Sequence, residues 1–315
     1  MIGIVLHLQA IKKQCMDIHG QHILSTDQFD KESLIALFEE AVEMEKVILA
    51  GGSDVLKGKI MATLFFEPST RTRFSFETAM LRLGGSVISN ADMLRTSSLK
   101  KQETLEDTGK TVSQMVDVIV MRHPEAGSVA KLAECSDVPV INAGDGPEDH
   151  PTQGLLDVYT MWKEKGGLDG LTVGMVGDLK YGRVVHSQCA LLKHFEVKFV
   201  FVAPEGLKMP SGLVEGAKEV TDLAEIIEDL DVISMTRVQE ERFEDKAEYE
   251  KYAGSYVLDT GLMAKAKADA IVIHPLPRVN EIAVEVDTDK RAKYFEQPRN
   301  GVAVRMALLK AVLSD

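Results

Sequence analysis

Residues 60–73 read Ile-Met-Ala-Thr-Leu-Phe-Phe-Glu-Pro-Ser-Thr-Arg-Thr-Arg, and this stretch decides the fold. The apolar run from Ile60 to Phe66 is typical of a buried strand, and Glu67-Pro68 predicts a turn. A helical pattern then runs from about Thr72 to Leu83 and stops at Gly84-Gly85. A strand, a loop and a helix in this order are the repeating unit of a parallel α/β sheet.

The same alternation continues along the rest of the chain. Helices are predicted at about 30–49, 125–134 and 300–313, and strands at 116–121, 138–141, 171–176, 197–202, 232–235 and 271–273. Because 315 residues exceed the usual size of one core, we predict an α/β protein of two doubly wound parallel-sheet domains with a cleft between them. The first domain is predicted to cover residues 1–151, completed by a C-terminal helix within 293–315, and the second to cover 152–292. Two polar segments, 91–102 and 238–254, are predicted to be mobile loops.

The composition excludes several classes of protein. A formal net charge of −13 disfavours binding to nucleic acid or to an anionic membrane, since neither polyanion gains from an acidic surface. Three widely spaced cysteines, Cys15, Cys135 and Cys189, suggest neither a disulfide framework nor a zinc site. The apolar start Met1 to Leu8 is too short to span a membrane and lacks the basic residues of a signal peptide. We therefore expect a folded cytoplasmic protein without a membrane anchor, a metal or a cofactor.

The turn after the first strand carries the first candidate site. Hydroxyl and guanidinium groups stand where a helix begins, from Ser69 through Thr70 and Arg71 to Thr72. A helix start offers unpaired N–H groups and the positive end of the helix dipole, so these side chains favour phosphate binding. Ordinary helix capping explains Ser69 or Thr70 equally well, but it leaves Arg71 unexplained.

Chemically active side chains follow three more predicted strands or the loops after them. The segments are Arg122-His123-Pro124, His150-Pro151-Thr152-Gln153 and His274-Pro275-Leu276-Pro277-Arg278. In an open parallel sheet, ligands bind beyond the carboxyl ends of the strands. Each segment alone could be structural, but their common location favours a binding site.

These motifs resemble those of the aspartate/ornithine carbamoyltransferase family. The resemblance rests on Ser69-Thr70-Arg71-Thr72, on His150-Pro-Thr-Gln153 and on His274-Pro-Leu-Pro277, and it extends from about His22 to Leu313. It implies a carbamoyl phosphate-binding domain followed by an amino acid-binding domain. The first twenty or so residues, including Met1 to Leu8, have no clear counterpart and are interpreted as an extension or a misplaced start.

Within the family, the acceptor-site segments resemble the enzymes that use L-aspartate. These segments are Gly177-Asp178-Leu179-Lys180-Tyr181-Gly182-Arg183 and Thr236-Arg237-Val238-Gln239. Enzymes that use ornithine typically carry Cys in place of Thr152 and of Pro275. The resemblance thus implies transfer of the carbamoyl group of carbamoyl phosphate to L-aspartate, a step of pyrimidine biosynthesis, with ornithine or another amine as the alternative acceptor.

The resemblance also implies a role for each matched residue. The phosphate of carbamoyl phosphate would be bound by Ser69, Thr70, Arg71 and Thr72. Its carbonyl oxygen would be bound by Thr72, Arg122 and His150. Its amide would be bound by Gln153 and by the backbone carbonyls of Pro275 and Leu276. Aspartate would contact Arg183 through its α-carboxylate and Arg237 with Gln239 through its side chain.

Ser97 and Lys101 match residues that reach into the site of a neighbouring subunit, which implies a homotrimer. The segments 122–127 and 181–186 resemble catalytic chains that assemble with a zinc-containing regulatory chain, so an allosteric enzyme is a further hypothesis.

Charge arithmetic agrees with these roles. Carbamoyl phosphate and deprotonated aspartate bring roughly four negative charges. Five positive charges answer them, on Arg71, Lys101, Arg122, Arg183 and Arg237. Phosphate is a good leaving group, so the chemistry requires alignment and charge stabilisation rather than a protein nucleophile or a metal.

Two other classes of protein are compatible with parts of the sequence. Gly174-Met175-Val176-Gly177-Asp178 follows a strand as the loops of nicotinamide-dependent dehydrogenases do, but the GxGxxG spacing is absent. A catalytically silent scaffold subunit is the other alternative, and the intact site positions argue against it.

Overall fold

The computed structural model describes residues 18–314 except 148, 240–242, 244 and 253, so the segment Met1 to Leu8 and Cys15 lie outside the described residues. The chain divides into two compact units, one formed by residues 1–155 and 298–315 and the other by 156–297. The divisions predicted from the sequence were at 151 and 292. Within the described part of the chain, no helix is both long and apolar enough to cross a membrane.

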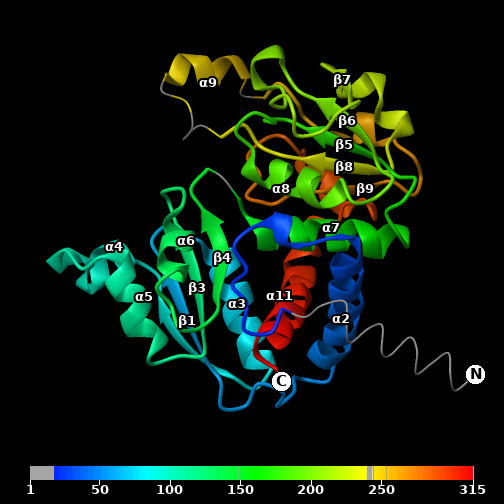
Figure 1. Cartoon of the computed structure of the whole chain (residues 1–315). Coiled ribbons are helices and arrows are strands. Elements are labelled where there is room, and N and C mark those ends of the chain that lie inside the picture. The colour runs from blue at the N-terminus through cyan, green and yellow to red at the C-terminus, as the bar shows by residue number, and fades with distance from the viewer. Residues whose placement is uncertain (1–17, 148, 240–242, 244, 253, 315) are drawn as a thin grey trace, which may run out of the picture. The chain divides into compact units, whose positions relative to one another are not determined.

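The first unit is built around a four-stranded parallel sheet in the order β2-β1-β3-β4. Its elements are η1 (Thr26–Gln28), α2 (Lys31–Leu49), β1 (Ile60–Phe65), α3 (Thr70–Arg82), β2 (Ser86–Asn90), α4 (Met93–Thr96), η2 (Ser98–Lys101), α5 (Leu105–Ser113), β3 (Val118–His123), α6 (Ser128–Ala133) and β4 (Val140–Asp145), with the start of α7 (Pro151–Lys165) and most of α11 (Gln297–Leu313). Helices cover both faces of the sheet, with α3 and α11 on one side and α5 and α6 on the other (Figure 1).

Local sequence explains why these elements form where they do. Asp30 caps α2 by accepting a hydrogen bond from the Ser33 N–H at 2.8 Å, and the buried residues of the helix recur with helical spacing at Leu34, Leu37, Phe38, Ala41 and Met44. The strand β1 is buried from Met61 to Phe65 because it lies between two neighbours and under helices on both faces. The predicted strand, loop and helix at 60–83 are thus confirmed.

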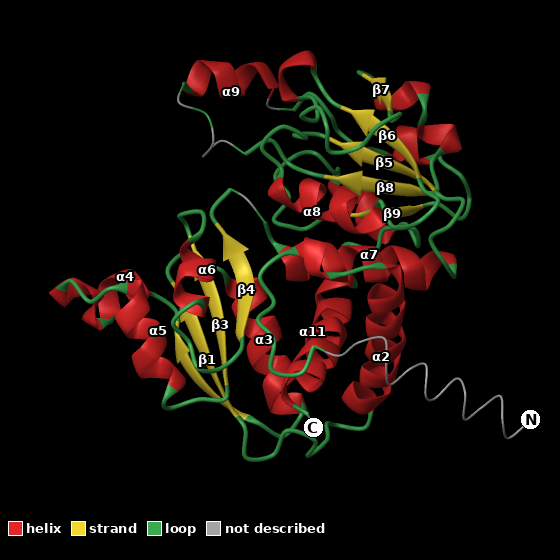
Figure 2. Ribbon diagram, in the orientation of Figure 1, coloured by secondary structure: helices red, strands yellow, loops and turns green. Residues whose placement is uncertain are grey.

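The second unit contains a five-stranded parallel sheet in the order β7-β6-β5-β8-β9. Its elements are β5 (Thr172–Val176), α8 (Arg183–Leu192), β6 (Lys198–Val202), η3 (Glu205–Leu207), β7 (Lys218–Val220), η4 (Leu223–Glu225), η5 (Ile227–Asp229), β8 (Val232–Met235), α9 (Lys246–Tyr252), α10 (Thr260–Met263), β9 (Ile271–Ile273) and η7 (Val284–Thr288). The strands and the helices around them are distinguished in Figure 2.

Side chains alternate between the two faces of this second sheet. Ile233 and Met235 of β8 belong to a core cluster with Leu223, Ile227 and Leu258. Ser234, between them in sequence, points to the opposite face and donates its hydroxyl hydrogen to Gln188 of α8 at 2.9 Å. One face of the sheet is therefore apolar, and the other carries a buried polar side chain toward a helix.

The structure corrects the predicted secondary structure at two strands and at two loop segments. The strands β2 and β7 were not predicted, and both lie at sheet edges, where burial is low and the apolar signal is weak. The segments predicted as loops contain helices, namely α4 and η2 within 91–102 and α9 within 238–254. The predicted two-domain α/β fold with parallel sheets is confirmed.

Candidate active site

The carboxyl ends of β1, β3 and β4 gather most of the candidate residues of the first unit. The chain leaves β1 through Phe66, Glu67 and Pro68 and enters α3 at Thr70, with Ser69 in the N-cap position. The Ser69 side chain makes no capping hydrogen bond to α3, all of whose residues are described. Simple capping therefore does not explain this serine. The positive end of the helix dipole faces the same turn, where Thr72 is buried and Arg71 is exposed.

The Arg122 guanidinium is held firmly at the end of β3. Its Nε and Nη2 donate to the same oxygen, Oε2 of Glu67, over 2.9 and 2.7 Å, and its side chain is 11% exposed. In the adjacent strand β4, Gly144 has φ of 128°, and a Cβ on it would lie 3.2 Å from Nη1 of Arg122. Glycine is thus needed at 144 both for the backbone conformation and for the space that the guanidinium occupies.

His150 stands at the start of α7 and is 4% exposed. Its backbone carbonyl accepts hydrogen bonds from the N–H groups of Gln153 and Gly154, at 3.0 and 3.1 Å, which begins the helix. Pro151 occupies the first helical position, where a missing N–H costs nothing. The His-Pro-Thr-Gln motif is therefore a helix start that fixes the position of the imidazole, with Gln153 half-buried one turn further on.

Arg305 of α11 ties the two helix starts of this site together, and sequence reasoning missed it. Its guanidinium donates to the hydroxyls of Ser75 in α3, at 2.9 Å, and of Thr152 in α7, at 3.2 Å. The residue is 2% exposed, and its Cζ lies 4.9 Å from the centre of the Phe76 ring. A buried arginine in an amphipathic helix cannot be told from an exposed one by periodicity alone.

Ser97 and Lys101 lie in the segment of α4 and η2. The Ser97 hydroxyl donates to the carbonyl of Met93 at 2.6 Å, and the side chain of Lys101 is exposed. These two residues are therefore presented on a short helical projection that follows the edge strand β2.

In the second unit, the candidate aspartate residues follow β5 and β8. Arg183 is the first residue of α8, and Arg237 follows Thr236 at the end of β8; both arginines are half-buried. The side-chain amide of Gln239 donates to the carbonyl of Tyr181 at 3.3 Å, which joins the two loops. The structure thus brings the 177–183 loop and the 236–239 segment together at the carboxyl ends of β5 and β8.

Asp178 supports the 177–183 loop from inside. Its Oδ1 accepts a hydrogen bond from the Tyr181 N–H at 2.9 Å, and the residue is fully buried. Burial raises the pKa of Asp178, although backbone N–H groups of the loop oppose the shift. The preceding Gly177 has φ of 120°, and a Cβ on it would lie 2.1 Å from the carbonyl oxygen of Thr236. Only glycine fits there, because the two loops approach so closely.

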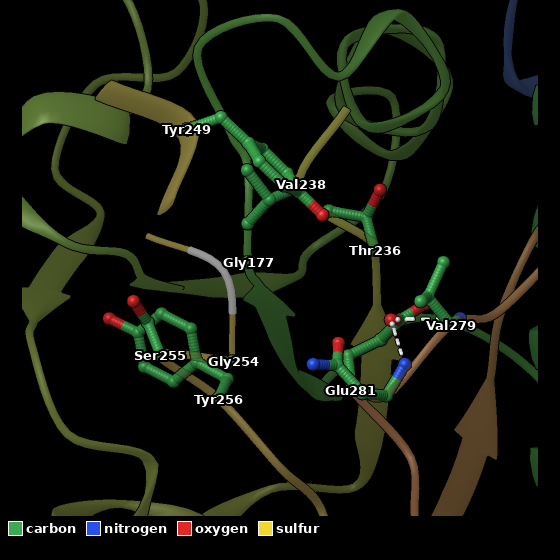
Figure 3. A pocket seen from close by; sticks show the side chains of 10 residues that line it. Gly177, Thr236, Val238, Tyr249, Gly254, Ser255, Tyr256, Val279 and Glu281 are labelled. Atoms are coloured by element: carbon green, nitrogen blue, oxygen red, sulfur yellow. Dashed lines mark hydrogen bonds between the residues drawn. The ribbon is translucent and has the colours of Figure 1, made fainter. Parts of the chain in front are cut away.

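A small pocket opens near the carboxyl ends of the same two strands of the second sheet (Figure 3). The pocket is lined by residues from the loops after β5 and β8, from the segment 249–256 and from the segment after Pro277. These residues are Gly177, Thr236, Val238, Tyr249, Gly254, Ser255, Tyr256, Val279, Asn280 and Glu281. Among these described lining residues, none is one that the sequence predicts to bind aspartate. Arg183, Arg237 and Gln239 are not among the residues that line this pocket.

Pro275 and Leu276 come after His274, the first residue beyond β9. Leu276 has φ of 54°, a left-handed conformation that is rare for a residue with a bulky side chain. Both residues are half-buried. A backbone of this shape requires support from neighbouring groups.

Two parallel-sheet units, with arginine, histidine and hydroxyl side chains at their strand ends, define a two-domain α/β protein. The chain belongs to the aspartate/ornithine carbamoyltransferase family: residues 21–163 match its carbamoyl-P binding domain, and residues 169–312 match its Asp/Orn binding domain. Gly174 lies inside β5 rather than in a loop, which also removes the basis of the dehydrogenase alternative.

Individual relatives agree with this assignment. The aspartate carbamoyltransferase catalytic subunit of Methanopyrus kandleri is 50% identical over 302 residues, which are 93% of this chain and 97% of the relative. The crystal structure of aspartate transcarbamoylase from Trypanosoma cruzi, in complex with carbamoyl phosphate and aspartate, matches with a TM-score of 0.90 at 40% identity, covering 95% of this chain and 99% of the other. The catalytic subunit of M. jannaschii aspartate transcarbamoylase matches with a TM-score of 0.85 at 46% identity, covering 92% and 97% of the two chains.

Proposed function

We propose that this chain is an aspartate carbamoyltransferase, which transfers the carbamoyl group of carbamoyl phosphate to the amine of L-aspartate and releases phosphate. The observation that carries the proposal is the likeness, over nearly the whole chain, to a structure that holds both of these substrates. The reaction is a step of pyrimidine biosynthesis, and the proposed location of the enzyme is the cytoplasm.

Most of the contacts proposed for carbamoyl phosphate come from the first unit. The phosphate of this substrate takes the hydroxyls and amides at the start of α3, with Ser69, Thr70, Arg71 and Thr72 as ligands. The Ser69 hydroxyl, which does not cap the helix, and the helix dipole both support this assignment. The carbonyl oxygen of the substrate is assigned to Thr72, Arg122 and His150, and its amide to Gln153 and the backbone carbonyls of Pro275 and Leu276.

Aspartate is assigned to the second unit. Arg183 takes the α-carboxylate, and Arg237 with Gln239 takes the side-chain carboxylate. Arginine suits both positions because its planar fork binds two carboxylate oxygens at once. The hydrogen bond from Gln239 to Tyr181 supports a shared role, since it links the loops that carry the two arginines.

The proposed chemistry is a direct displacement. The neutral amine of aspartate attacks the carbamoyl carbon, a C–N bond forms, and a tetrahedral oxyanion develops next to Thr72, Arg122 and His150. The C–O bond to phosphate then breaks, and the departing phosphate accepts the proton that the amine loses. Alignment of two bound reactants lowers a barrier by roughly 7–11 kcal/mol, and one oxyanion donor contributes roughly 3–4 kcal/mol.

The active assembly proposed is a homotrimer, in which Ser97 and Lys101 enter the site of a neighbouring subunit. Exposed apolar side chains near this projection support an interface: Phe74 of α3 is 51% exposed, Ile88 of β2 57% and Leu94 of α4 53%. We further propose that the catalytic chain assembles with a zinc-containing regulatory chain, which would place the enzyme under allosteric control. This proposal rests on the form of the segments 122–127 and 181–186.

The decisive experiment is an assay of the purified chain for carbamoyl aspartate formation. Carbamoyl phosphate should be consumed with aspartate and not with ornithine, and no NADH should bind. Turnover with ornithine alone would replace the acceptor assignment, and no turnover with either amine would favour the silent subunit. Native mass of the chain, alone and with a co-expressed zinc-containing partner, tests the assembly.

A further inference from the structure

His274 stands out because the proposed function uses the backbone that follows it and gives its side chain no task. The imidazole is 1% exposed and directly follows β9. Its Nδ1 accepts a hydrogen bond from the Leu276 N–H at 2.8 Å, so this nitrogen carries no proton. Its Nε2 lies 2.7 Å from Oε1 of Glu281 and must therefore carry the ring proton and donate it. The contacts fix one neutral tautomer.

Glu281 closes the segment from the other end. Its second oxygen, Oε2, accepts hydrogen bonds from the N–H groups of Val279 and Asn280, both at 3.1 Å (Figure 3). The imidazole and the carboxylate together thus hold residues 274–281 as one closed loop. The left-handed backbone of Leu276 needs such support, because a bulky residue does not adopt it spontaneously.

A chain of buried side chains holds His274 from behind. The backbone N–H of His274 donates to Oε1 of Gln297 at 2.8 Å, and Nε2 of Gln297 donates to Oδ1 of Asp157 at 2.6 Å. The other carboxylate oxygen of Asp157 accepts from Gln188 at 2.7 Å, and Gln188 accepts from Ser234 at 2.9 Å. All five residues are at most 2% exposed, so this network fixes β9 against α7, α8 and the start of α11 within the second unit.

The imidazole also sets the direction of one carbonyl. In a trans peptide the N–H of one residue and the C=O of the preceding residue point in opposite directions. The peptide between Pro275 and Leu276 is trans. Because the Leu276 N–H points at the imidazole, the carbonyl of Pro275 must point away from it. A hydrogen-bond acceptor is thereby aimed away from the buried imidazole.

We propose that His274 is a positioning residue that makes the site select carbamoyl phosphate over acetyl phosphate, by aiming the Pro275 carbonyl. This inference rests on the proposed function, which assigns the carbamoyl amide to the carbonyls of Pro275 and Leu276. Acetyl phosphate has the same shape but carries a methyl group in place of the amino group. A fixed carbonyl accepts an N–H from the amino group and gains nothing from the methyl group, so the aim of the carbonyl decides the selectivity.

Two substitutions separate the functions of the two ring nitrogens. His274→Asn places an acceptor where Nδ1 stands and removes the donor to Glu281. His274→Gln places a donor where Nε2 stands and removes the acceptor for Leu276. The measurement is the ratio of the dissociation constants of acetyl phosphate and carbamoyl phosphate, with inorganic phosphate as a third ligand. Ser234→Ala is the matched control, because it removes a buried hydrogen bond at the far end of the same network.

We expect His274→Gln to lower the ratio about tenfold, whereas His274→Asn and Ser234→Ala keep it within about threefold. The affinity for inorganic phosphate should stay unchanged in all three. An unchanged ratio in folded His274→Gln would overturn the inference. If His274→Gln does not fold, Gln297→Leu is the deciding variant, because it keeps the imidazole but removes the hydrogen bond that holds the backbone N–H of His274. A wild-type ratio of the two dissociation constants in Gln297→Leu would equally overturn the inference. Failure of the wild-type chain to bind carbamoyl phosphate would instead refute the proposed function.

Discussion

Glu67 fixes the guanidinium of Arg122 by accepting two hydrogen bonds on one oxygen, from Nε at 2.9 Å and from Nη2 at 2.7 Å. A Cβ added at Gly144 would lie 3.2 Å from the third nitrogen, Nη1. Because Glu67 already holds the guanidinium in place, the guanidinium does not have to reorient when negative charge develops on a substrate. A preorganised site stabilises a transition state in this way.

The first prediction concerns Arg122 itself. Arg122→Ala should lower kcat about a thousandfold, because it removes a charged donor from the proposed oxyanion. Arg122→Lys should recover only part of the loss, since an ammonium group cannot bond Glu67 and the substrate in the same fork geometry. Steady-state kinetics with both substrates measure the effect, and far-ultraviolet circular dichroism checks the fold. Turnover within tenfold of wild type in Arg122→Ala would remove this residue from the mechanism.

The second prediction tests the space beside the guanidinium. Gly144→Ala should lower kcat and also Tm, because the new Cβ meets Nη1 at 3.2 Å and the backbone has φ of 128°. Gly58→Ala is the matched control: Gly58 has φ of 88°, and a Cβ added there would have no described heavy atom within 4 Å. The control should lose a few degrees of Tm, as expected for about 1–3 kcal/mol of backbone strain, and keep its kcat. Equal kcat in the two variants would show that Gly144 serves the backbone alone.

The sequence predicted the fold well where burial gives a strong periodic signal. The stretch 60–83 folds as predicted because β1 is buried on both faces and α3 has clear start and stop signals. Edge strands failed for the opposite reason: Ser86–Asn90 has an irregular pattern of partly exposed residues, which no period describes. The α/β class and the family could therefore be predicted, but not every strand.

The candidate site divides in the same way. Residues that lie in the motifs were found from sequence, although their roles remain predictions. The residues that hold those motifs were not found: Asp157, Arg305 and Gln297 sit in helices, where a polar residue normally marks the solvent side. Only the fold shows that these side chains are buried and bonded to one another or to motif residues.

The third prediction follows from the buried guanidinium of Arg305. Arg305→Met keeps much of the volume but leaves the hydroxyls of Ser75 and Thr152 without their donor. The free energy of unfolding should fall by about 2–4 kcal/mol, since each buried group that loses its partner costs about 1–3 kcal/mol. The KM for carbamoyl phosphate should rise as well, because α3 and α7 carry the proposed ligands. The double variant Ser75→Ala with Arg305→Met should lose less stability than the sum of the single changes, and strict additivity would contradict the contact.

A fourth prediction concerns thiol reactivity. Burial raises the pKa of the Cys189 thiol to about 12, so at neutral pH hardly any thiolate is present to react. Cys135 is half-buried and should react first of the two. Labelling with a thiol reagent followed by peptide mass spectrometry should modify Cys189 only after unfolding. Modification of both residues at the same rate in the folded protein would disprove the burial of Cys189.

The last prediction is the pH dependence of stability that comes from Glu281. Burial opposes ionisation of this carboxyl, but the hydrogen bond from His274 and the backbone N–H groups outweigh it, so its pKa lies below the ordinary value. A carboxyl with a lowered pKa stabilises the folded state above its unfolded pKa of about 4.3, and this contribution disappears as the pH falls through the folded value. Thermal unfolding of the wild type between pH 3 and pH 7 should show this acid limb. Glu281→Gln should be less stable at pH 7 and should approach the wild type at the acidic end, because protonation has by then removed the advantage of the carboxylate. Two curves that stay parallel across the whole range would show that the charge of Glu281 does not hold the 274–281 loop.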